Sequence, residues 1–152
     1  MKIIILLSAG ILILAIILIS WKFYCSADRE EQKANKEVKI QIKAVIENGK
    51  KHLKLYDSHG NSAKDTLTTG VQIDGSIRWE LKAFSKIDKI VRIYSEDPAK
   101  VIFKEDAMDN GDNVFILKIP EGVSEGMKEK YIIKFTHKDG VTDSIDPYIR
   151  IE

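Results

Sequence analysis

The chain opens with a long run of apolar residues that contains no charged side chain. From Ile3 to Trp21 the run would extend about 28 Å as a helix, close to a hydrocarbon core of about 30 Å. A helix that is apolar on every side needs apolar surroundings, which a domain this small cannot provide. We therefore expect residues 1–21 to form a transmembrane helix, a signal anchor that makes the lipid bilayer a partner of this protein.

The residues after this run favour retention of the helix over its cleavage. Trp21, Phe23 and Tyr24 place amphipathic rings where one membrane interface should lie, and Lys22 can reach the headgroups beside them. The alternative is a secretory signal that is cleaved near Ala27 and leaves a secreted domain. We favour the anchor because the run is longer than the usual signal core of about 7 to 15 residues.

The orientation of the anchor depends on two opposing considerations. The basic residues near its ends favour a cytoplasmic domain, since Lys2 precedes the run and four others follow it: Lys22, Arg29, Lys33 and Lys36. However, the amino terminus adds a charge beside Lys2, and domains longer than about 60 residues cross membranes largely regardless of charge. We expect a single-pass protein of the cell envelope with an extracytoplasmic domain, and a cytoplasmic domain is the alternative.

After a charged spacer at residues 22–36, the apolar positions change to a period of two. Val38, Ile40 and Ile42 alternate with polar residues, as is typical of a half-buried strand. Similar segments recur up to the C-terminus, separated by clusters of Gly, Pro, Asp and Asn. The pattern predicts about nine strands, at residues 38–46, 53–56, 68–73, 76–82, 90–94, 101–103, 114–119, 130–137 and 148–151.

Short strands at near-regular spacing, with no convincing helix between them, predict an antiparallel β-sandwich for residues 37–152. The pattern resembles that of an immunoglobulin-like sandwich. Trp79 lies on an early-to-middle strand and Tyr131 begins a late one, where that fold class has its core tryptophan and its corner tyrosine. The paired cysteines of antibody domains are absent, because Cys25 is the only cysteine. We expect Trp79 to anchor the core.

Composition limits the classes of function without indicating an activity. Lys and Arg number 24 and Asp and Glu number 23, so a formal charge of +1 gives no global attraction for nucleic acid. Phosphate-binding glycine loops, zinc-binding helices and nucleophile elbows are all absent from the sequence. We expect neither a cofactor nor an enzymatic activity. A hydrolase built in space around His59 or His137 is the least favoured alternative.

The segment 106–113 carries the most oxygen-rich side chains. Three carboxylates there are the candidates for binding a hard cation such as calcium: Asp106, Asp109 and Asp112. In an EF-hand alignment with Gly111 as the loop glycine, Met108 and Leu117 would fall at positions that need carboxylates. Because tight turns favour the same residue types, we expect a turn here and no metal site.

The sequence leaves the binding partner open. An anchor joined to a β-domain without catalytic motifs predicts a non-enzymatic module that binds another envelope protein or supports an assembly. The alternative is a ligand-binding module, for a cation or a glycan, that uses the strand-end loops 57–65 and 106–113. Four lysines of the first hairpin also predict a small basic patch within reach of lipid headgroups: Lys43, Lys50, Lys51 and Lys54.

Overall fold

A computed structural model describes residues 36–47 and 50–152, and Lys36–Glu152 form one compact unit. The predicted transmembrane helix and spacer lie outside the described residues, as do three aromatic residues proposed to flank the membrane: Trp21, Phe23 and Tyr24. Within residues 36–47 and 50–152 there is no helix of the length and apolarity needed to cross a membrane. The described part of the chain is all-β, which confirms the predicted class.

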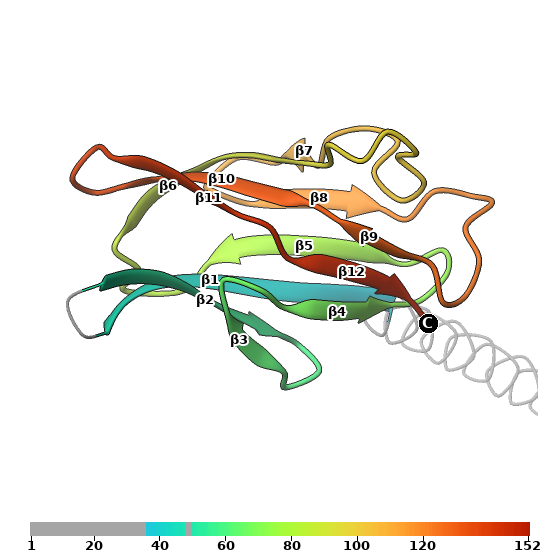
Figure 1. Ribbon diagram of the computed structural model, residues 1–152, viewed down its shortest axis with the longest axis horizontal. Helices are drawn as coiled ribbons and strands as arrows, with labels where there is room; N and C mark the ends of the chain where they lie inside the picture. The colour runs from blue at the N-terminus through green and yellow to red at the C-terminus, as the bar shows by residue number, and fades with distance from the viewer. Residues whose placement is uncertain (1–35, 48–49) are drawn as a thin grey trace, which may run out of the picture. The chain divides into compact units, whose positions relative to one another are not determined.

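The described residues form twelve strands, which Figure 1 labels in chain order. Their bounds are β1 (Glu37–Glu47), β2 (Lys50–Asp57), β3 (Ser62–Lys64), β4 (Thr68–Val71), β5 (Ser76–Leu81), β6 (Ile87–Tyr94), β7 (Met108–Asp109), β8 (Phe115–Lys118), β9 (Lys128–Lys130), β10 (Ile132–His137), β11 (Thr142–Ile145) and β12 (Tyr148–Ile151).

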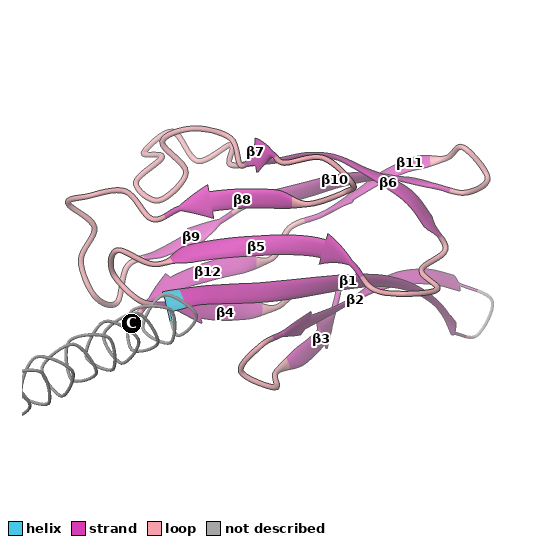
Figure 2. Cartoon of the chain, turned by 180° about the vertical axis from the view of Figure 1, so that it is seen from behind, coloured by secondary structure: helices cyan, strands magenta, loops and turns pink. Residues whose placement is uncertain are grey.

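The strands are arranged in three sheets. The largest has the order β3-β2-β1-β5-β8-β7, and the other two have the orders β11-β10-β6 and β4-β12-β9. Only Tyr131 separates β9 from β10, and only residues 146–147 separate β11 from β12, so the two smaller sheets continue one another along the chain (Figure 1). Viewed from behind, the large sheet lies in front, with β1, β5 and β8 side by side (Figure 2).

Two pairings correct the expectation of a purely antiparallel fold. β1 runs parallel to β5, with Ile40 opposite Trp79, and β12 runs parallel to β4. Parallel neighbours require a crossover connection, and β2, β3 and β4 lie between β1 and β5 in the chain. The alternation of apolar residues reports which face of a strand is buried but carries no information on the direction of its neighbour.

Several element boundaries also differ from the predicted ones. Residues 101–103 form no strand, because their apolar side chains enter the core from an irregular segment. β3 and β7 lie inside the predicted loops 57–65 and 106–113, and the pairing of Glu47 with Lys50 extends both strands of the first hairpin beyond their predicted bounds. β11 is missing from the predicted set because its residues are mostly exposed and show no alternation.

Side chains from the large sheet meet those of the smaller sheets in one hydrophobic core. Trp79 of β5 is fully buried and its Nε1–H donates a hydrogen bond to the hydroxyl of Tyr131, at 3.1 Å. Phe103 stacks on the Tyr131 ring with the centroids 5.2 Å apart. Burial raises the pKa of the Tyr131 phenol. Trp79 thus lies in the core, as predicted. The Tyr131 hydroxyl accepts a hydrogen bond from a facing side chain, whereas in a tyrosine corner it would bond to the upstream backbone.

Candidate functional site

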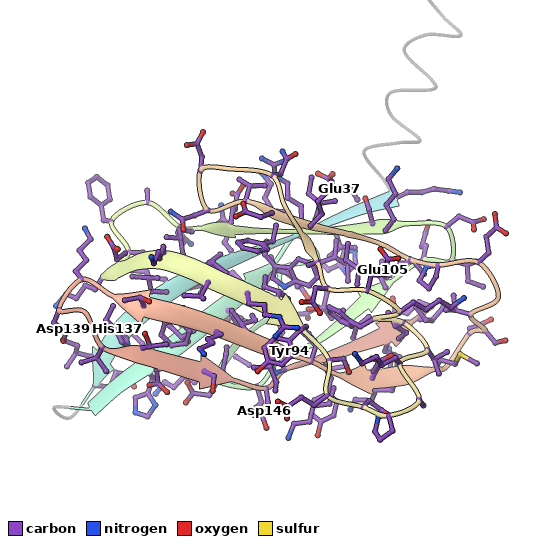
Figure 3. The ribbon with its side chains drawn as sticks, turned by 90° about the horizontal axis from the view of Figure 1, so that it is seen from above. Glu37, Tyr94, Glu105, His137, Asp139 and Asp146 are labelled. Carbon is purple, nitrogen blue, oxygen red and sulfur yellow. The ribbon has the colours of Figure 1, made fainter. Side chains whose placement is uncertain are left out.

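The long strands give the domain two ends that differ in chemistry. Figure 3 shows His137 and Asp139 at the end opposite Glu37, where β1 begins. We call the end with Glu37 the entry end; it comprises residues 36–37, 72–75, 119–127 and 152. We call the opposite end the distal end; it comprises residues 46–47, 50–51, 82–86 and 137–141, at the end of β1, the start of β2 and the turns after β5 and β10.

The most unusual residue of the distal end is Phe84, in the loop between β5 and β6. Its side chain is 97% exposed and its backbone has a φ of 59°. A non-glycine residue in this region carries a strain of the order of 1–3 kcal/mol, and a bulky side chain is rarely found there. Because the ring is exposed, it contributes no free energy of burial to the stability of the fold. Both features point to a role outside the folding of this chain.

Hydrogen bonds to β1 hold this loop in place on both sides of the exposed ring. The buried Ser85 Oγ accepts the backbone N–H of Ala44 at 3.4 Å and that of Ile87 at 3.2 Å. The backbone N–H of Lys82 donates to the carbonyl of Ile42 at 2.9 Å. The loop backbone is therefore fixed to the sheet, and the phenyl ring is presented by a rigid support.

A hollow of about 340 Å³ lies beside the loop, and we call it the distal pocket. Its lining comes from the end of β1, the loop after β5 and the β10–β11 hairpin: Ala44, Ile46, Lys86, His137, Lys138 and Asp139. The backbone N–H of Lys138 donates to the Lys86 carbonyl at 3.1 Å, which joins two of its walls. Ile46 is 50% exposed, and Val141 of the hairpin is 56% exposed. Apolar surface therefore extends over this end.

The distal pocket and the entry end also differ in charge. Among its described lining residues the pocket has two lysines, Lys86 and Lys138, and one carboxylate, Asp139, which gives a formal charge of +1. The entry end has Lys36 against five carboxylates, which gives −4: Glu37, Asp74, Glu121, Glu125 and Glu152. The total of +1 for the whole chain therefore conceals a local excess of carboxylates at the entry end.

The aspartates of the predicted turn are held separately. Asp106 Oδ2 lies 2.5 Å from Arg92 Nε, and this hydrogen bond raises the pKa of Arg92. Asp109 Oδ1 accepts the backbone N–H of Gly111 at 2.9 Å, and Asp112 has a positive φ of 50°. In the part of the chain that the structure describes, no group of three or more His, Cys, Asp and Glu side chains could hold a metal ion.

The three histidines lie on different parts of the domain. His52 Nδ1 is 3.0 Å from Asp65 Oδ2 on the outer face of the large sheet, whereas His137 is buried against Phe135. His59 is exposed in the turn after β2. The structure thus places the three histidines in separate surroundings, two of them outside the distal pocket.

Asp57 closes the turn that follows β2. Its Oδ1 accepts backbone N–H groups from His59 at 3.0 Å and from Asn61 at 2.8 Å, and its Oδ2 accepts the Asn61 side-chain amide at 3.0 Å. The carboxylate of this predicted loop is therefore used by the loop itself.

Two of the four lysines of the predicted basic patch, Lys43 and Lys54, lie across the first hairpin on the outer face of the large sheet. Lys43 is directly opposite Lys54, and Lys54 is directly opposite Lys64. The ammonium groups of Lys54 and Lys82 lie 5.2 Å and 3.9 Å from the centroid of the Tyr56 ring. Like charges in opposite positions repel, and the aromatic face offsets part of that cost.

The conformation of Phe84 could not be predicted from sequence motifs, because residues 82–86 (KAFSK) contain no Gly or Asn that would indicate a positive φ. The one signal in the sequence is a phenylalanine between two lysines in a short interval between strands. No protein-family model matches this chain, and no curated protein is similar to it in sequence.

Proposed function

We propose that this protein is a single-pass membrane protein whose β-sandwich domain binds another protein at the cell envelope and catalyses no reaction. The anchor is supported by the uncharged run from Ile3 to Trp21 and the aromatic residues that follow it. The binding role is supported above all by Phe84, an exposed aromatic ring on a strained but firmly held loop.

The physics of interfaces explains why such a ring favours protein binding. Aromatic side chains bury roughly 150–250 Å² each and are enriched among the residues that dominate binding energy. A side chain on a fixed backbone loses little conformational freedom when it is covered, so less of the contact energy is lost to ordering. Ile46 and Val141, both about half exposed, would extend the contact around the ring.

We further propose that the sheets form an immunoglobulin-like sandwich and that the domain is extracytoplasmic. The sandwich is supported by Trp79, which packs against Tyr131 at 5.5 Å between ring centroids. The two parallel pairings, β1 with β5 and β12 with β4, make it a variant of that architecture. The extracytoplasmic side is supported by the length of the domain, because domains longer than about 60 residues cross membranes largely regardless of charge.

The proposal is tested by photo-crosslinking of the full-length protein in intact cells. A photoreactive phenylalanine is placed at position 84, and the control places it at Val91, which is 42% exposed on β6. We expect position 84 to form a discrete adduct with a protein, and position 91 to form none above background. Equal labelling from both positions, or no protein adduct at position 84, would contradict the proposal.

A further inference from the structure

The distal pocket has the size of a site for one apolar side chain. At about 340 Å³ it lies near the lower limit of the roughly 300–1,000 Å³ that is usual for small-molecule sites. A cavity of about 150 Å³ already accommodates a benzene ring. The distal pocket therefore has room for a leucine or phenylalanine side chain together with part of the backbone that carries it.

The lining of the pocket combines an apolar base with a cationic rim. Ala44 and Ile46 supply apolar surface, and the alkyl stems of Lys86 and Lys138 can cover an apolar side chain while their ammonium groups stay in water. Carboxylates on the entering segment would meet these ammonium groups. Among macromolecular occupants, an acidic segment is favoured because the described lining carries two lysines, Lys86 and Lys138, and one carboxylate, Asp139.

Two other modes of contact are disfavoured. A second copy docked end to end would bring the pocket lysines of one copy, Lys86 and Lys138, close to those of the other. Addition of a strand to the exposed edge of β11 is opposed by Asp143, whose Oδ1 accepts the backbone N–H of Ser144 at 2.8 Å. Recognition through side chains in the pocket remains the mode that suits this end.

We infer that the distal pocket binds an acidic segment of the partner protein, with one apolar side chain of that segment between Ile46 and Lys86 and with Phe84 packed beside it. This inference rests on the proposed function and names the chemistry of its partner. The carboxylates of the segment pair with Lys86 and Lys138, which lie on two walls joined by a backbone hydrogen bond.

The first experiment maps the segment that enters the pocket. The photoreactive residue replaces Ile46 in the full-length protein, cells are irradiated, and the adduct is digested and sequenced by mass spectrometry. We expect a peptide of another protein that has an apolar residue with Asp or Glu within a few positions. A lipid adduct, a peptide of this chain, or a segment without carboxylates would overturn the inference.

The second experiment reverses the charges of the rim. In Lys86→Glu/Lys138→Glu the adduct yield should fall about tenfold, since two attractive contacts become repulsive. The matched control is Lys89→Glu/Lys134→Glu, which changes two exposed lysines on β6 and β10 away from the pocket and should leave the yield unchanged. Reversal of the partner's own carboxylates to lysine should restore the adduct with the first variant.

The outcomes separate this inference from the function on which it rests. If positions 46 and 84 capture no protein, both fail. If position 84 captures a protein and the yield does not respond to reversal at Lys86 and Lys138, the binding function stands and the acidic segment is wrong. Thermal unfolding of both charge variants, which we expect to match the parent, shows that any loss arises at the interface.

Discussion

Two phenylalanines on irregular segments of this domain differ strongly in their exposure to solvent. Phe103, in the connection from β6 to β7, is 1% exposed and stacks on Tyr131, whereas Phe84 is 97% exposed. Each segment is held by a buried polar side chain that accepts backbone N–H groups. Glu129 Oε2 accepts those of Ile102 at 2.6 Å and Phe103 at 3.3 Å, as Ser85 does for the other loop.

The comparison separates two uses of an aromatic residue outside regular structure. The hydrogen bonds to Glu129 hold the Phe103 segment so that its ring enters the core, where burial stabilises the fold. The hydrogen bonds to Ser85 hold the strained backbone of Phe84 and leave its ring in water, where the ring does not stabilise the isolated chain. The same local chemistry thus supports folding in one segment and, in our proposal, binding in the other.

The largest expected difference is between the two truncations to alanine. Phe103→Ala should lower the free energy of unfolding by about 3–5 kcal/mol, the range for a buried phenylalanine. Phe84→Ala should change it by no more than about 0.5 kcal/mol, as for most surface substitutions. Denaturant unfolding of the full-length protein, followed by the fluorescence of buried Trp79, measures both. Equal losses would remove the contrast between the two segments.

The next effect concerns the carboxylate that holds the buried segment. Glu129→Leu should cost about 2–4 kcal/mol, because two buried N–H groups lose their acceptor. Glu125→Leu changes an exposed carboxylate on the preceding loop and should be nearly neutral. If both variants unfold at the same denaturant concentration as the parent, Glu129 does not hold Phe103 in the core.

A smaller effect is expected at the support of the exposed loop. Ser85→Ala removes the acceptor for the N–H groups of Ala44 and Ile87, at a cost of about 1–2 kcal/mol. The loosened loop should also reduce the adduct yield from position 84, which can be compared with the yield in Ser144→Ala, a change on the exposed strand β11. Full stability together with full crosslinking would show that Ser85 does not position the ring.

The smallest effect isolates the backbone strain. Phe84→Gly should be about 1 kcal/mol more stable than Phe84→Ala, because glycine adopts a positive φ without steric cost. The neighbouring change Ala83→Gly, at a residue without a positive φ, should instead destabilise by about 0.5–1 kcal/mol. The opposite order in melting temperatures would mean that the loop relaxes in solution to an unstrained conformation.

The sequence predicts the regular parts of this fold well. β1 and β12 lie where the alternation of apolar residues predicts them, because a strand with one buried face leaves a period of two in the sequence. The same signal fails for Ile102 and Phe103, since a short apolar run reports burial and not backbone geometry. It also misses β11, whose residues are exposed on both faces of the strand.

The candidate site is much less predictable. The conformation of Phe84 is fixed by tertiary hydrogen bonds of Ser85 and Lys82, and the loop contains no residue type that would predict a positive φ. The distal pocket joins residues about 40 and 90 positions apart in the chain, such as Ile46, Lys86 and Lys138. Three-dimensional proximity of this kind becomes visible only in the folded domain.

The most direct test of the account measures binding and stability in the same variant. Phe84→Ala is combined with the photoreactive residue at position 46, and both the adduct yield and the free energy of unfolding are compared with those of the parent. We predict unchanged stability within about 0.5 kcal/mol and a yield reduced more than tenfold, as for an aromatic residue that dominates an interface. An unchanged yield, or a loss of stability comparable to that of Phe103→Ala, would contradict the claim that Phe84 is presented for binding.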